Sequence, residues 1–110
     1  MNIDEMTIGE FKNLQSAFGS RKQKYFPYKV GDKVFIRSVT LYYIGKIEKI
    51  EGDWVTLSNA SWIADTGRFF DFLKDGECNE YESFQNNVSI HIGSMIDITE
   101  WKHDLFSGNK

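Results

Sequence analysis

Between residues 30 and 62 apolar and polar side chains alternate, and this alternation limits the possible folds more than any other feature of the sequence. The segments 33–37 and 41–50 are rich in β-branched and aromatic residues, a composition typical of strands with two unlike faces. Glu-Gly-Asp at 51–53 has the composition of a turn, and a further strand begins at Trp54. The pattern predicts a three-stranded meander with short connections.

The same pattern returns in the last third of the chain. Val88, Ile90 and Ile92 alternate with polar residues, Gly93-Ser94 interrupts them, and a last short strand is expected at 95–98. Together with the meander, these segments predict a mainly β (α+β) fold. The expected architecture is a twisted antiparallel sheet or a partly open small barrel, with an N-terminal helix and one short inserted helix.

The short inserted helix is expected at residues 68–75, between the two sets of strands. Asp65 or Thr66 offers a side-chain oxygen that can cap its first turn. Gly76 can take the left-handed conformation that commonly ends a helix.

The first 28 residues are expected to form a separate N-terminal element. Apolar residues recur at three- and four-residue steps from Ile8 to Phe18, which predicts a helix with one apolar face. We expect a single domain over residues 1–110, with the N-terminal helix and a basic, aromatic linker at 1–28 and the β domain at 29–105.

Composition and charge narrow the possible functions. Thirteen basic against sixteen acidic residues give a net charge of −3, which argues against nucleic-acid binding, because sequence-independent binding of this kind usually needs a positive excess. The single cysteine, Cys78, cannot form an internal disulfide, which fits a reducing compartment. No signal-peptide-like start or long apolar run is present, so we expect a cytoplasmic protein that has no membrane partner.

The sequence gives little support for catalysis or for a metal. His91 and His103 have no third ligand at metal-like spacing, and Cys78 lies far from both in the sequence. A Gly-x-Ser-x-Gly motif, a glycine-rich phosphate loop and a paired set of carboxylates are all absent from the sequence. We therefore expect a binding protein that is not an enzyme and has no metal or cofactor.

Two family resemblances extend this interpretation. The segment 41–60 resembles the middle strands of Sm-like barrels, with an aromatic-x-Gly-x-apolar strand, an Asp-containing turn and a strand that ends in Leu-x-Asn-Ala. Sm-like proteins form rings that bind RNA. The resemblance implies an alternative function as a small-barrel nucleic-acid-binding protein.

The second resemblance is longer and covers roughly residues 30 to 105. The matching residues are Ile36-Arg37, Tyr42-Tyr43-Ile44-Gly45, Leu57, Ala60-Ser61-Trp62-Ile63-Ala64-Asp65-Thr66-Gly67-Arg68-Phe69, Leu73, Gly76, Asn79-Glu80 and Asp97-Ile98-Thr99-Glu100-Trp101. The series is similar to a group of small phage and prophage proteins, which in turn resembles the Thoeris anti-defence sponges. Those phage proteins bind cyclic ADP-ribose signals made by TIR-domain immune enzymes and hold them intact in the cytoplasm of the host bacterium.

The resemblance to the sponges implies roles for individual residues. An aromatic ring that stacks on adenine would be Phe69, and an amide that reads the base would be Asn79, ten residues later. Arginines that hold the diphosphate would be Arg37 and Arg68, since guanidinium groups pair with phosphate oxygens. The family has a further arginine in the last strands, where this chain has His91 or Ile92.

Two more rings are candidate stacking surfaces. On a helix, Phe69, Phe72 and Leu73 share the core-facing stripe, and Phe70 lies about a quarter turn away. Phe70 should therefore be the more exposed ring and Phe69 the buried one. The family spacing favours Phe69, so both stay candidates, and Trp62 is either a second stacking surface or a core residue.

The aromatic fraction of 15% is more than one small core readily buries, so we expect a homo-oligomer, at least a dimer. A further alternative is a phage structural or assembly protein that binds no ligand.

Overall fold

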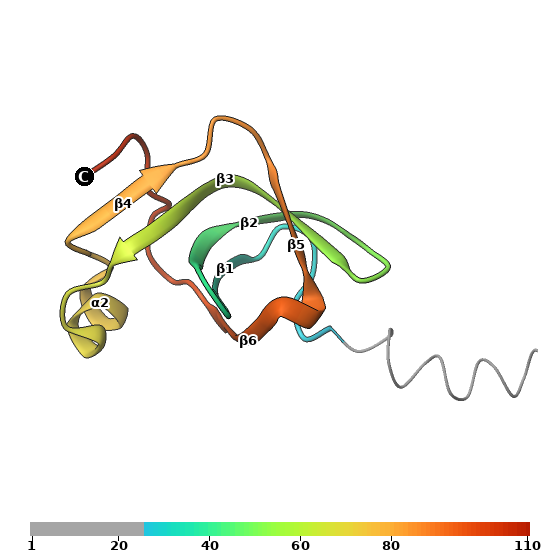
Figure 1. Ribbon diagram of the computed structural model, residues 1–110, viewed down its shortest axis with the longest axis horizontal. Coiled ribbons are helices and arrows are strands. Elements are labelled where there is room, and N and C mark those ends of the chain that lie inside the picture. The colour runs from blue at the N-terminus through green and yellow to red at the C-terminus, as the bar shows by residue number, and fades with distance from the viewer. Residues whose placement is uncertain (1–25) are drawn as a thin grey trace, which may run out of the picture.

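The computed structural model describes residues 26–110, and the predicted N-terminal helix lies outside this range. The elements in chain order are β1 (Lys33–Ser38), β2 (Tyr42–Glu51), β3 (Trp54–Asp65), α2 (Phe69–Asp75), β4 (Glu80–Ser83), β5 (Val88–His91), the 3-10 turn η2 (Ile92–Ser94) and β6 (Met95–Glu100). All strand pairs are antiparallel, and the order across the sheet is β4-β3-β2-β1-β6, with β5 also paired to β3 (Figure 1). The predicted mainly β fold is confirmed; the sheet is twisted and is not closed into a barrel.

Strand β3 shares its outer edge between two partners. Its first four residues pair with β5, and its segment from Ser61 to Asp65 pairs with β4. Between the two lies Asn59, which has a φ of 48° and is the one residue other than glycine with positive φ in the range 26–110. Gly45 on the neighbouring β2 leaves room there, because a Cβ atom on Gly45 would lie 3.0 Å from the Cβ of Leu57 and 3.2 Å from the Cα of Ala60. The sheet bends where these two backbones approach.

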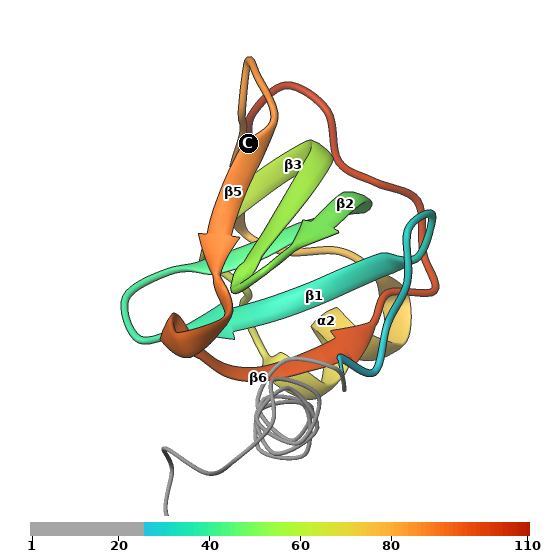
Figure 2. The same ribbon diagram turned by 90° about the vertical axis from the view of Figure 1, so that its right-hand side faces the viewer.

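The turn η2 links two strands that belong to opposite edges of the sheet. β5 pairs with β3, whereas β6 pairs with β1, so only three residues carry the chain across (Figures 1 and 2). The amide of Gly93 donates a hydrogen bond of 2.9 Å to Nδ1 of His91, which caps the start of this turn. The sheet is therefore curled around one of its faces.

The inner core lies on this enclosed face. Its buried residues are Val34, Ile36, Ile47, Val55, Leu57, Ala60 and Ile90. All seven come from strands and all are aliphatic. The curled sheet therefore encloses this core with its own side chains, as the alternating sequence pattern predicts.

The outer core lies on the opposite face and is mainly aromatic. Its buried residues are Phe35, Ile44, Ile63, Phe72, Cys78 and Trp101. Helix α2 contributes Phe72, and the segment after β6 contributes Trp101, with Leu105 and Phe106 packed beside it. The segment after the last strand is thus part of the folded domain.

The start of α2 differs from the prediction. The cap residue is Arg68, which makes no capping hydrogen bond with its side chain, so the expectation of a cap from Asp65 or Thr66 was wrong. Asp65 instead accepts a 2.8 Å hydrogen bond from the amide of Gly67, which has a φ of 69° and turns the chain just before the helix. The predicted end at Gly76 is confirmed, with a φ of 75° and an amide that donates to the carbonyl of Phe72.

Candidate functional site

The surface of α2 brings together several of the residues singled out from the sequence. Phe70 is 69% exposed and is the more exposed ring, as the helical pattern predicts, but Phe69 is 40% exposed, so the expectation of a buried Phe69 was wrong. Phe69 is partly covered by Phe35 of β1 and by Phe72, each with its ring centroid 6.2 Å away. Helix α2 therefore presents two aromatic rings to the surface.

Arg37 of β1 lies over the ring of Phe69, with its Cζ atom 5.4 Å from the ring centroid. Its Nε donates to both carboxylate oxygens of Asp97, at 2.8 and 2.9 Å, and its Nη2 also bonds to this carboxylate. The hydrogen bond with Asp97 raises the pKa of Arg37, and the same bond lowers the pKa of Asp97 below its ordinary value. The guanidinium group is thus held in place between a ring and a carboxylate, and an anionic ligand would share it with Asp97.

Arg68 and Asn79 line one hollow beside α2, with a volume of about 230 Å³. Its lining residues are Thr66, Gly67, Arg68, Asp71, Phe72, Asp75, Glu77, Cys78, Asn79 and Lys110. The side-chain amide of Asn79 donates a long hydrogen bond of 3.5 Å to the carboxylate of Asp65. The same amide lies against Gly67, where a Cβ atom would be only 3.1 Å from its nitrogen and oxygen. Three carboxylates against two cations make the hollow itself suited to hydrogen-bond donors rather than to phosphate.

Trp62 and His91 do not join this group. Trp62 lies between Ser61 and Ile63 in β3, and Ile63 belongs to the outer core under α2, so Trp62 projects from the opposite face of the sheet. His91 lies at the end of β5, with its ring edge-on to Trp54 at 5.0 Å between centroids. Neither residue can act at the same site as Phe69 within one subunit.

The described residues offer little for catalysis. Cys78 is buried, and desolvation raises the pKa of its thiol above its ordinary value, so the reactive thiolate is disfavoured at neutral pH. Within residues 26–110 no three His, Cys, Asp or Glu side chains are placed to hold a metal ion.

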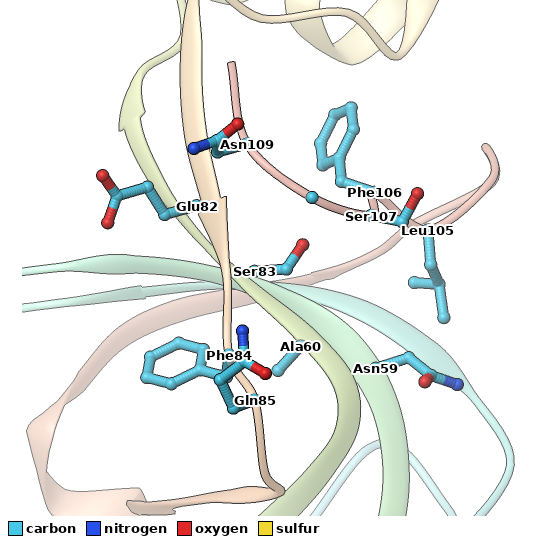
Figure 3. Close-up of a pocket in the computed structure, with 11 residues that line it drawn as sticks. Asn59, Ala60, Glu82, Ser83, Phe84, Gln85, Leu105, Phe106, Ser107 and Asn109 are labelled. Atoms are coloured by element: carbon cyan, nitrogen blue, oxygen red, sulfur yellow. The ribbon is translucent and has the colours of Figure 1, made fainter.

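A larger hollow, of about 780 Å³, lies between β3, β4 and the C-terminal segment (Figure 3). Its lining residues are Asn59, Ala60, Glu82, Ser83, Phe84, Gln85, Leu105, Phe106, Ser107, Gly108 and Asn109. Phe84 with Gln85 and Phe106 with Asn109 lie on opposite sides of Ser83 in Figure 3. None of the lining residues is basic, so this hollow suits an uncharged polar ligand better than a phosphate.

This second hollow could not be predicted from the sequence, because its wall is built by contacts between residues far apart in the chain. The C-terminal segment lies against the outer edge of β4, where Glu82 forms a bridge with Asn109 and the ring of Tyr81 stacks on Phe106 at 4.5 Å. The apolar pair Leu105-Phe106 after the last predicted strand was the one local signal that this segment packs on the domain.

No helix in residues 26–110 has the length and apolar character to cross a membrane. No family model, curated protein or solved structure matches the chain.

Proposed function

We propose that this protein is a non-catalytic phage anti-defence protein that binds a cyclic ADP-ribose-type nucleotide and sequesters it unchanged. The site is the surface of α2. The observation that carries the proposal is the pair of exposed rings on α2, Phe69 and Phe70, together with the guanidinium group of Arg37, which lies 5.4 Å from the centroid of Phe69. An adenine base stacks on such a ring, and the adjoining cation attracts its phosphates.

The charges around α2 set the orientation of the ligand. The hollow that contains Asn79 has three carboxylates, which repel a diphosphate but accept hydrogen bonds from amino groups. We therefore place the adenine edge toward Asn79 and the diphosphate toward the two guanidinium groups, that of Arg68 on the same hollow and that of Arg37 beside Phe69.

The exposed side of α2 also supports a homo-oligomer, in the cytoplasm of the host bacterium where such signals are made. Phe70 and Leu73 are 69% and 37% exposed on the same short helix, and apolar side chains grouped in this way usually mark an interface. A second copy packed against α2 would enclose the ligand and supply further donors.

The test is calorimetry with a panel of cyclic ADP-ribose isomers, followed by mass spectrometry of the ligand released by heat. Replacement of Arg68 by alanine should reduce affinity about ten- to a hundredfold, because a charge-assisted contact with phosphate contributes roughly 1.5–3 kcal/mol. Asn79→Ala should weaken adenine nucleotides selectively. Lys46→Ala removes an exposed charge from β2 and serves as the matched control, with no expected change.

Three outcomes would contradict the proposal. Linear ADP-ribose that accumulates with time would make the protein an enzyme. Unchanged affinity in both α2 variants would refute the site. RNA binding that falls steeply with salt, without nucleotide binding, would favour the Sm-like alternative.

A further inference from the structure

Trp54 stands apart from both cores, on the outward face of the β2–β3 hairpin. It is 50% exposed, whereas Trp101 is 2% exposed in the outer core. Its cross-strand neighbours are Glu51 on β2 and His91 on β5. The next row of the same face holds Lys49, Thr56 and Ser89.

The indole of Trp54 is held in a fixed position. The ring of His91 meets it edge-on, at 5.0 Å between centroids and an interplanar angle of 89°. His91 is fixed in turn, because Nδ1 accepts the hydrogen bond from the amide of Gly93, which leaves the proton of the neutral ring on Nε2. A Cβ atom at position 93 would lie 2.9 Å from Nδ1 of His91, so alanine there would displace the imidazole. An exposed aromatic ring that packs against a neighbouring ring needs little ordering when a ligand binds.

Polar groups surround the exposed indole. Lys49 Nζ lies 3.4 Å from Glu51 Oε2, and the hydroxyls of Thr56 and Ser89 are 2.8 Å apart. These four residues and Trp54 line a hollow of about 370 Å³. One ammonium and one carboxylate leave the hollow without excess charge.

We infer that the hollow formed by Lys49, Glu51, Trp54, Thr56 and Ser89, here called the Trp54 platform, is a binding site for an uncharged sugar ring. A pyranose has an apolar face of C–H groups and a rim of hydroxyls. The indole face receives the C–H groups, while the carboxylate of Glu51, the ammonium of Lys49 and the hydroxyl of Ser89 bond the rim. A nucleotide fits less well, because the charge of Lys49 is already offset by Glu51, and the five described residues that line the hollow include no second cation for a phosphate.

The site is independent of the nucleotide site proposed above. Trp54 pairs with β5 at the opposite end of β3 from the residues that lead into α2. Substitutions on the Trp54 platform should therefore leave nucleotide affinity unchanged, and substitutions on α2 should leave sugar affinity unchanged.

The test is a titration of the full chain with maltohexaose, cellohexaose, chitohexaose and mannohexaose, with adenosine as the comparison. Tryptophan fluorescence is read in a Trp62→Phe background, so that the signal from exposed indole comes from Trp54. At least one oligosaccharide should give a saturable change. Trp54→Ala, followed by calorimetry, should lower its affinity about tenfold or more, and Trp54→Phe should lower it less.

Two further variants address the surroundings of the indole. Glu51→Gln keeps the shape but removes the charged acceptor, and a severalfold loss of affinity is expected. Gly93→Ala should also weaken binding severalfold, because the new Cβ atom displaces the His91 ring that packs edge-on against Trp54. The inference is overturned if no oligosaccharide binds, if Trp54→Ala and Glu51→Gln both leave affinity unchanged, or if adenosine binds at Trp54 in place of the sugars.

Discussion

The inner and outer cores lie back to back on the same strands, yet they are built differently. In β1 the side chains of Val34 and Ile36 enter the inner core, while Phe35 between them enters the outer core. The buried residues of the inner core are aliphatic and all come from strands, and Phe26 and Tyr28 from the segment before β1 pack against them. The outer core is aromatic and is covered by α2 and by the segment after β6. A curled sheet fills most of its concave side with its own side chains, whereas its convex side needs a helix and a long segment of chain to cover it.

Contacts between large aromatic rings hold the outer core together, although a short helix and a segment without regular structure cover it. The ring of Phe72 lies 5.1 Å from that of Phe35 and 5.0 Å from that of Trp101, between centroids. A seven-residue helix is too short to be stable alone, so these contacts hold α2 in place. The proposed nucleotide site therefore depends on the outer core much more than on the inner one.

The largest expected effect comes from Phe72→Ala. Phe72 is fully buried, and its loss should lower the free energy of unfolding by about 3–5 kcal/mol. Chemical denaturation measures the change, and Leu57→Ala in the inner core, with an expected loss of about 2–5 kcal/mol, is the comparison. A loss below about 1 kcal/mol for Phe72→Ala would mean that α2 is only a peripheral cover.

Gly76→Ala tests how closely the C-terminal segment fits the end of α2. The new Cβ atom would lie 2.4 Å from Cγ of His103, whose ring bonds the carbonyl of Leu73, and the φ of 75° is unfavourable for alanine. We expect a loss of about 2–4 kcal/mol in the free energy of unfolding. Gly108→Ala has a similar φ of 72° but open space around it, so its loss of unfolding free energy measures the cost of the backbone conformation alone. Equal losses in the two variants would show that His103 moves aside freely.

Gly45→Ala is the corresponding test of the inner core. Its Cβ atom would contact Leu57 and the backbone of Ala60 at the bend of the sheet, and we expect a loss of about 1–3 kcal/mol. Gly52→Ala, at the hairpin turn, has open space but a φ of 58°, so its loss reports backbone strain alone, whereas the loss at Gly45 reports the close approach of Leu57 and Ala60. A neutral Gly45→Ala would mean that the bend does not require the close approach of β2 and β3.

The smallest effect is expected from Asp97→Asn, at the margin of the outer core. Arg37 lowers the pKa of Asp97, so the pair stabilises the folded state above the ordinary aspartate pKa of about 3.9, and this contribution is lost as the pH falls through the lower native value. Both side chains are more than one third exposed, so the change in melting temperature should be small. Melting curves between neutral and acidic pH should show a smaller acid-dependent decrease in the variant than in the wild type.

The sequence allowed prediction of elements that depend on local pattern. The meander follows from alternating side chains and the turn at residues 51–53, and the end of α2 follows from Gly76, because both depend on neighbours in the chain. The positive φ of Asn59 could not be foreseen. It arises where β3 changes partner from β5 to β4, and this change depends on residues far away in the sequence.

The candidate site was predictable in part for the same reason. Arg68, Phe69 and Phe70 lie together because they are neighbours in the sequence. The turn after α2 brings Asn79 back beside Arg68. Trp62 was separated from them by the alternation of β3, and His91 by the pairing of β5 with β3. The polar surroundings of Trp54 come from three different strands, so no local pattern contains them.

The pairing of β1 with β6 also determines the order in which the domain can be completed during synthesis. Arg37 and Asp97 face each other across this pair although 60 positions separate them in the chain. Until the ribosome has released β6, one edge of β1 has no partner, and exposed strand edges invite pairing with other chains. Closure of so long a loop also slows folding relative to the local meander. The nascent chain is therefore most vulnerable to aggregation after its first hairpin has formed and before its last strand arrives.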